Sequence, residues 1–219
     1  MSIGTILLIA AGLLILFGAG QRVLDRLRLT DRQALMFIAL IIIGGYLPDI
    51  PLGRDFAFNL GGALVPVALC VYLFIKADTL AERLRAAFAS LLTAVAVMAL
   101  GRLLPEEPEA MIVDPNYAYG LTAGVIAYLL GRSRRSAFIA GVMGVTLAHL
   151  AQWGYLRSQG VEQRLVLGGA GAYDVIVLSG LIAVLLAELV GEAIERAQRG
   201  KRRPVREFKN GAFVGKERE

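Results

Sequence analysis

The chain is poor in the residues that build redox and metal centres. Its 219 residues include one cysteine (Cys70), one histidine (His149) and one tryptophan. A single cysteine excludes an internal disulfide and the paired-cysteine metal motifs. The sequence also lacks a P-loop and the HExxH and GxSxG motifs of hydrolases. We therefore expect no cofactor and no metal site, and the sequence contains no soluble-enzyme motif.

Charged residues are also scarce, at 19% of the chain, whereas 57% is hydrophobic and the mean hydropathy is +0.63. A soluble domain of this size would have too little polar surface to face water, so we expect an integral membrane protein. The net charge of +5 and the pI near 9.6 are compatible with nucleic-acid binding. Because most basic residues fall on one predicted side of the membrane, we expect membrane lipid as the partner, and no nucleic acid.

Seven apolar stretches predict an all-α polytopic membrane bundle of about seven transmembrane helices. They cover about residues 3–17, 34–47, 60–76, 84–104, 117–131, 137–156, and 167 to past 188. Between the second and third stretches, we interpret residues 49–59 as a loop that dips into the membrane.

The basic residues predict the orientation of this bundle. With the N-terminus outside, 19 of the 23 Lys and Arg residues lie on the inner side and four on the outer side. The positive-inside rule then places the C-terminus in the cytoplasm of a multi-pass protein of the cell inner membrane. We predict a membrane domain over residues 1–199 and a disordered basic tail over residues 200–219. The tail is a candidate contact for anionic lipid or for a protein.

Two short motifs recur in the same order along the chain. Gly-Tyr-Leu occurs at residues 45–47 and 154–156, and Leu-Gly-Gly-Ala occurs at residues 60–63 and 167–170. A parallel 3+1+3 repeat of helices, of a kind known among transporters, would explain this recurrence. Chance recurrence in a chain rich in glycine and leucine is the alternative.

Asp174 and His149 are the leading candidates for chemistry. Asp174 is predicted about two turns into the last helix, and a carboxylate within a membrane costs roughly 2.5–3.5 kcal/mol, so it is a functional candidate. The alternative is a neutral, hydrogen-bonded acid that orders the bundle. His149 is predicted at a similar depth on the preceding helix, and the pair could relay protons or bind a cation. A histidine that is simply hydrogen-bonded is the alternative.

The remaining pocket candidates cluster near the predicted outer face. They are Asp49, Asn59, Tyr173 and the glycines Gly61, Gly62, Gly169 and Gly171. The glycines permit close helix packing, or break a helix so that its amides face a ligand. Asn59 has the alternative role of a helix N-cap, and Asp49 that of a solvated residue. Tyr119, Tyr155 and Trp153 are read as interfacial aromatics, with pocket lining as the alternative.

Two segments resemble a known family. The first segment covers residues 59–66 and reads Asn-Leu-Gly-Gly-Ala-Leu-Val-Pro. The second covers residues 168–174, just before an apolar helix, and reads Gly-Gly-Ala-Gly-Ala-Tyr-Asp. Together they resemble an uncharacterised prokaryotic multi-pass membrane family, domain of unknown function 1614, over about residues 45–187. The resemblance carries over Asn59, Gly61, Gly62, Gly169, Gly171 and Asp174 as candidate site residues. The family tends to have an aspartate where this chain has His149, and it implies no function.

Three functions remain open. The leading hypothesis is a transporter of a small molecule or an ion, with a recessed polar pocket facing outside. A membrane scaffold or assembly factor without catalysis is the first alternative. The second alternative is an intramembrane hydrolase that uses Asp174 with a further acid or base, supplied by His149, Asp49 or Asp114. The substrate, the ion and the oligomeric state do not follow from the sequence.

Overall fold

The structure is a computed structural model that describes residues 29–103, 115–131, 133–199, 206–209 and 212–215. The chain forms two compact units, Met1–Ala187 and Glu188–Glu219. The first predicted transmembrane helix, residues 3–17, and Asp114 lie outside the described residues.

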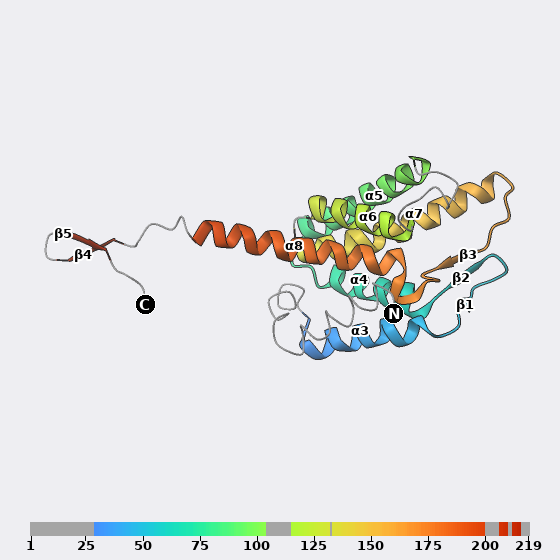
Figure 1. The fold of residues 1–219 in the computed structure, drawn as a ribbon, viewed down its shortest axis with the longest axis horizontal. Coiled ribbons are helices and arrows are strands. Elements are labelled where there is room, and N and C mark those ends of the chain that lie inside the picture. Colours follow the sequence, from blue (N-terminus) through green and yellow to red (C-terminus); the bar gives the residue numbers. More distant parts are fainter. Residues whose placement is uncertain (1–28, 104–114, 132, 200–205, 210–211, 216–219) are drawn as a thin grey trace. The chain divides into compact units, whose positions relative to one another are not determined.

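The described part of the chain contains six α-helices, each within or overlapping a predicted apolar stretch (Figure 1). They are α3 (Asp31–Gly45), α4 (Val65–Ile75), α5 (Leu80–Leu103), α6 (Pro115–Gly131), α7 (Arg134–Ser158) and α8 (Val175–Arg199). A single π-helical turn, η1 (Leu60–Leu64), leads directly into α4, and a 3₁₀ turn, η3 (Gly171–Tyr173), precedes α8. By length and composition, α5 and α7 can each cross a membrane, and the other apolar helices are shorter.

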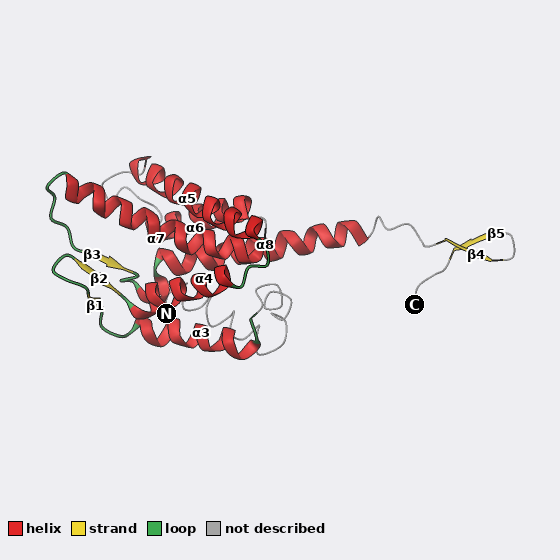
Figure 2. Cartoon of the chain, turned by 180° about the vertical axis from the view of Figure 1, so that it is seen from behind, coloured by secondary structure: helices red, strands yellow, loops and turns green. Residues whose placement is uncertain are grey.

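A small sheet accompanies the helices (Figure 2). Strand β1 (Ile50–Pro51) pairs antiparallel with β2 (Phe56–Phe58), and β2 pairs in parallel with β3 (Leu165–Leu167). The segment interpreted as a dipping loop is therefore a hairpin, whose backbone groups pair with each other and with β3. In the second unit, where the sequence predicts a disordered tail, β4 (Arg206–Lys209) pairs with β5 (Ala212–Gly215).

Local sequence signals explain the starts of two helices. Thr30 caps α3, and its side-chain oxygen accepts a hydrogen bond from the backbone N–H of Gln33 at 3.3 Å while the Gln33 side chain accepts from the Thr30 N–H. This reciprocal capping box satisfies two backbone donors that a helix leaves unpaired. Ser133 caps α7 by a single bond, because its side-chain oxygen accepts from the backbone N–H of Ser136 at 3.1 Å.

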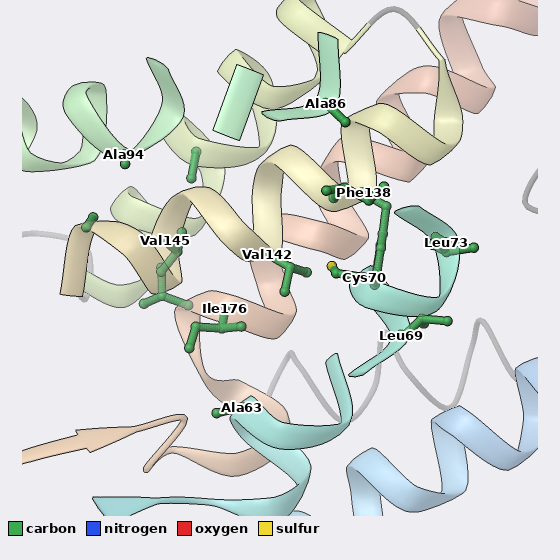
Figure 3. Close-up of a cluster of buried hydrophobic side chains, with 14 of the residues drawn as sticks. Ala63, Leu69, Cys70, Leu73, Ala86, Ala94, Phe138, Val142, Val145 and Ile176 are labelled. Atoms are coloured by element: carbon green, nitrogen blue, oxygen red, sulfur yellow. The ribbon is translucent and has the colours of Figure 1, made fainter. Parts of the chain in front are cut away.

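Helix α7 is the central helix of the first unit. It packs against α4, α5 and α6, and all eight residues from Arg135 to Val142 are buried. Farther along α7, Val145 joins the same apolar cluster as Leu73 of α4 and Ile176 of α8 (Figure 3). A helix that is buried on every side requires neighbours on all its faces.

Helix α5, in contrast, exposes an apolar face. Large side chains at spacings of three and four residues lie on one side of this helix. Leu80, Leu84, Phe88, Leu91 and Val95 are between 58% and 70% exposed. A water-facing helix normally places polar residues on such a face.

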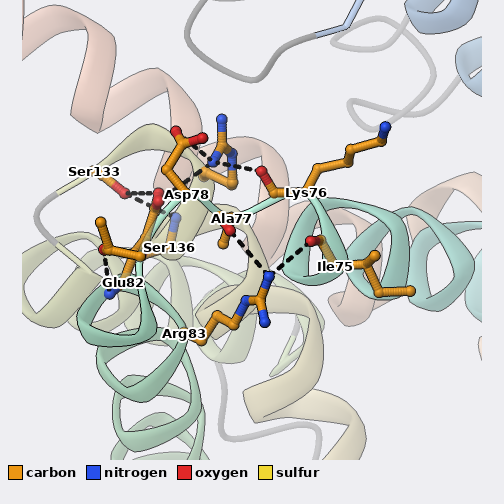
Figure 4. A network of polar contacts seen from close by, with 10 residues as sticks. Ile75, Lys76, Ala77, Asp78, Glu82, Arg83, Ser133 and Ser136 are labelled. Carbon is orange, nitrogen blue, oxygen red and sulfur yellow. Dashed lines mark hydrogen bonds and ion pairs between the residues drawn. The ribbon is translucent and has the colours of Figure 1, made fainter.

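A buried arginine joins the connection between α4 and α5 to the start of α7 (Figure 4). Arg135 is 4% exposed. Its guanidinium donates hydrogen bonds to the Glu82 carboxylate and to the carbonyl of Lys76, both at 3.3 Å. The guanidinium also lies 3.7 Å from the Asp78 carboxylate. Arg83 donates to two further carbonyls of the same connection. These bonds satisfy backbone carbonyls that the end of α4 leaves unpaired.

Candidate functional site

Asp174 does not lie within a helix, and this corrects the prediction that places it two turns into the last one. Residues 165–167 form β3, a turn and the 3₁₀ turn follow, and Asp174 has extended backbone angles (φ −62°, ψ 146°) just before α8. The reason is that Gly168 (φ +70°) and Gly171 (φ +61°) adopt left-handed conformations, which end a helical path. Tyr173 closes the 3₁₀ turn, and its side chain lies outside the described part of the structure.

The Asp174 carboxylate caps the start of α8. One oxygen accepts a hydrogen bond from the backbone N–H of Ile176 at 3.0 Å, and the other accepts from Ala170 at 3.3 Å. The residue is 8% exposed, and its carboxylate interacts electrostatically with the imidazole of His149 on α7. Asp174 therefore has a structural role as a cap, and it lies within electrostatic reach of His149.

Asn59 caps the π-helical turn η1, which is the alternative role that the sequence offered. Its side-chain oxygen accepts from the backbone N–H groups of Gly61 and Gly62 at 3.0 and 2.9 Å. Its side-chain nitrogen donates to the carbonyl of Leu47 at 3.2 Å and to the Asp49 carboxylate at 3.1 Å. An asparagine amide has two donor hydrogens and two acceptor lone pairs, so these four bonds use its full capacity.

Five glycines bring three distant segments into backbone contact. A β-carbon added to Gly62 would overlap the carbonyl oxygen of Gly168, and one added to Gly61 would overlap the backbone of Ile41 and Gly45. A β-carbon on Gly171 would lie 2.9 Å from the Cα atom of Gly45.

We call Gly45, Gly61, Gly62, Gly168 and Gly171 the glycine junction. Gly169 is not part of it, because a β-carbon there would meet the side chain of Val166, in its own segment, at 3.0 Å. The junction leaves no room for a ligand between these backbones. Its glycines therefore act in close packing.

The candidate residues thus form two groups. Hydrogen bonds join Asn59 to Asp49, Gly61 and Gly62, whereas electrostatics joins His149 to Asp174. Within the described residues the two groups connect through backbone, where the Asn59 N–H donates to the carbonyl of Leu167 at 2.8 Å and Gly62 packs on Gly168.

A cavity of about 580 Å³ lies between α5, α6 and α7. Its lining residues are Val97, Met98, Gly101, Arg102, Tyr119, Ala148, His149, Gln152 and Tyr155. Of the described residues predicted for the site, His149 lines this cavity, and so do Tyr119 and Tyr155, for which pocket lining was the alternative to an interfacial role. His149 and Gln152 also line a neighbouring cavity of about 200 Å³, beside Trp153 and Arg164.

Five polar side chains line the larger cavity. Within the described ranges, the side chains of Arg102, Tyr119, His149, Gln152 and Tyr155 form no hydrogen bond to another residue. Arg102, Gln152 and Tyr155 are exposed to solvent, and Tyr119 and His149 are half-buried, so all five can bond to water or to a ligand. Sequence reasoning missed Arg102 and Gln152. The sequence signal that could have identified them is their position: each lies near the end of a helix, and both helices were predicted to end at the outer face of the membrane.

A comparison with known families places the chain. A family model described as "Protein of unknown function (DUF1614)" matches residues 23–186, well over half of the chain, and this confirms the resemblance. No curated protein and no solved structure matches the chain.

Proposed function

The chain belongs to the DUF1614 family of proteins of unknown function, and we propose that it is a multi-pass inner-membrane transporter. In this proposal the cavity between α5, α6 and α7 binds a small solute or ion on the outer side. The observation that carries the proposal is the cavity itself, lined by five polar side chains that form no hydrogen bond to another residue within the described ranges. Its volume of about 580 Å³ falls within the range of about 300–1,000 Å³ that is typical of small-molecule sites.

The exposed apolar faces support a membrane location. Soluble monomers rarely expose contiguous apolar patches of more than a few hundred Å², and the Leu80–Val95 face of α5 is continuous over four turns. Helix α3 likewise exposes Met36, Leu40 and Ile43. Together with the spanning length of α5 and α7, these faces fit contact with lipid.

The register of the small sheet supports an internal repeat. The two Gly-Tyr-Leu motifs are 109 positions apart (154 minus 45), and the paired residues of β2 and β3 have the same separation (165 minus 56). After the first motif, which lies at the end of α3, β1, β2 and the π-helical turn lead into α4. After the second motif, which lies in the last turns of α7, β3 and the 3₁₀ turn lead into α8. Paired glycine-interrupted helices in two halves of a chain are typical of secondary transporters.

His149 supplies a physical link between the cavity and the repeat. Its imidazole lines the cavity, and it interacts electrostatically with Asp174, which caps α8 beside the glycine junction. A charged solute in the cavity would change the field at Asp174 and could favour one packing of α8 over another. A scaffold without a ligand would not require this arrangement.

Reporter fusions test the membrane topology. Fusions after Leu24, Lys76, Arg132 and Arg199 are expected to report the cytoplasm, because the predicted inner segments carry 19 of the 23 basic residues. Fusions in the exposed turns at Gly53 and Gly160 are expected to report the periplasm. Periplasmic activity at two or more of the first four sites would contradict the topology. A cytoplasmic tail would also place its basic residues beside anionic headgroups, as we propose.

A cavity-filling variant tests the binding site. Ala148 lines the cavity and is 2% exposed, so Ala148→Leu is expected to occupy ligand space. Ala151→Leu on the exposed side of α7 is the matched control. We would screen the full chain in lipid nanodiscs against a library of small polar solutes, following its thermal unfolding. A ligand at 100 times its Kd stabilises the folded state by about 2.7 kcal/mol.

We expect solutes that stabilise the wild type and the Ala151→Leu protein but not the Ala148→Leu protein. A solute found in this way is then tested for accumulation in proteoliposomes, which separates transport from binding alone. Solutes that stabilise both variants equally would place binding outside the cavity and would contradict the proposal.

A further inference from the structure

We infer that the cavity between α5, α6 and α7 takes a small organic anion with an apolar body, and that Arg102 binds its charged group. This inference rests on the proposed function, because it names the class of solute that the same cavity would bind.

The described polar lining carries one permanent charge, and that charge is positive. The nine described lining residues include no Asp or Glu, whereas Arg102 carries a permanent positive charge. Tyr119, Tyr155 and Gln152 can each donate a further hydrogen bond, and so can an imidazole nitrogen of His149. A cation would meet no compensating charge on this lining, but an anion would meet several donors.

Arg102 is available to a ligand. Its guanidinium forms no ion pair and no hydrogen bond with another residue in the described ranges. The residue is exposed to solvent and lines the cavity, which places it at the open side. A planar guanidinium binds a carboxylate through two parallel hydrogen bonds, which gives both affinity and orientation.

The remaining lining favours an apolar body on the ligand. Val97 and Ala148 are buried residues on facing helices, and Met98 lies beside Val97. The Tyr119 ring lies close to α5, since a β-carbon on Gly101 would be 3.3 Å from its hydroxyl oxygen. These surfaces can bury an aromatic or branched group, which an inorganic anion does not have.

Three probes of matched shape and different charge test this inference. They are 2-naphthoate, its neutral amide and 2-naphthylmethylamine. Binding to the full chain in nanodiscs is measured by equilibrium dialysis, with protein-free nanodiscs as the blank. We expect 2-naphthoate to bind about tenfold or more tightly than either other probe, since hydrogen bonds to charged groups are the stronger ones.

Arg102→Gln is expected to weaken 2-naphthoate binding about tenfold or more and to leave the amide within about twofold. Arg157→Gln is the matched control, because Arg157 lies at the end of α7, pairs with Asp55 at 3.2 Å and does not line this cavity. Arg102→Lys is expected to recover only part of the affinity, since a lysine keeps the charge but not the planar pair of donors.

Two results would overturn the inference and keep the proposed function. In one, 2-naphthylmethylamine binds as tightly as 2-naphthoate. In the other, Arg102→Gln retains full affinity for 2-naphthoate while Ala148→Leu loses it. Absence of binding by all three probes also counts against an anion with an apolar body. If instead 2-naphthoate binds equally to the wild type and Ala148→Leu, the probe is not in the cavity and the proposed site fails as well.

Discussion

Replacing Gly62 by alanine is expected to prevent stable folding. The added methyl group would overlap the carbonyl oxygen of Gly168, and a β-carbon on Gly168 would in turn overlap the backbone of Gly62 and Ala63. Because both partners are backbone, neither can move aside by changing a rotamer. Overpacking against side chains typically costs about 1–3 kcal/mol, so we expect a loss of more than about 3 kcal/mol here.

Gly154→Ala provides the matched control for this experiment. Gly154 lies within α7, and no atom would lie within 4 Å of its β-carbon, so alanine there should be neutral or stabilise the helix by about 0.5–1 kcal/mol. The measurement is thermal unfolding of the full chain in nanodiscs, with monodispersity by size-exclusion chromatography. Equal melting temperatures for the two variants would show that the glycine junction is not tightly packed.

Arg135→Met is expected to lower the free energy of unfolding by about 3 kcal/mol. The substitution keeps much of the side-chain volume but leaves the Oε2 atom of Glu82 and the carbonyl of Lys76 without the Arg135 donor, while Ser133 still donates to Oε1 of Glu82. Removing one partner of a buried ion pair costs about 3–5 kcal/mol. We take the lower end because the side chains of Glu82 and Asp78 are 20% and 48% exposed.

Arg85→Met is the control, because Arg85 lies on the exposed side of α5, one turn from the network. A surface substitution of this kind should change stability by no more than about 0.5 kcal/mol. The double variant Arg135→Met with Glu82→Leu should recover part of the loss, since it removes the carboxylate left unpaired. If Arg135→Met and Arg85→Met melt at the same temperature, the buried network does not hold the α4–α5 connection against α7.

The helices were predictable, because their signals are local. Each described helix lies within or overlaps an apolar stretch of the sequence. Two of the helices also begin directly after an N-cap residue, Thr30 before α3 and Ser133 before α7. Apolar length and capping act within a few residues along the chain, so they can be read without knowing which helices are neighbours.

The break before α8 was not predictable from its own segment. Residues 167–174 form a glycine-rich apolar run that is compatible with a helix start. Gly168 and Gly171 adopt positive φ where they pack against Gly62 and Gly45, which are more than one hundred positions away in the chain. A contact between distant segments therefore decides the local conformation. As a result, Asp174 caps α8 and does not lie in the interior of a helix, where the sequence predicted it.

For the candidate site, the sequence by itself determined which residues are rare and costly in an apolar chain, and these are His149 and Asp174. Only the tertiary structure decided how each polar group is used. The hydrogen bonds of Asn59 are all used within the protein, whereas Arg102, Tyr119 and Gln152 line an open cavity between three helices. The physical reason is that a cap is made by neighbours in sequence, but a cavity exists only where separate helices fail to fill the space between them.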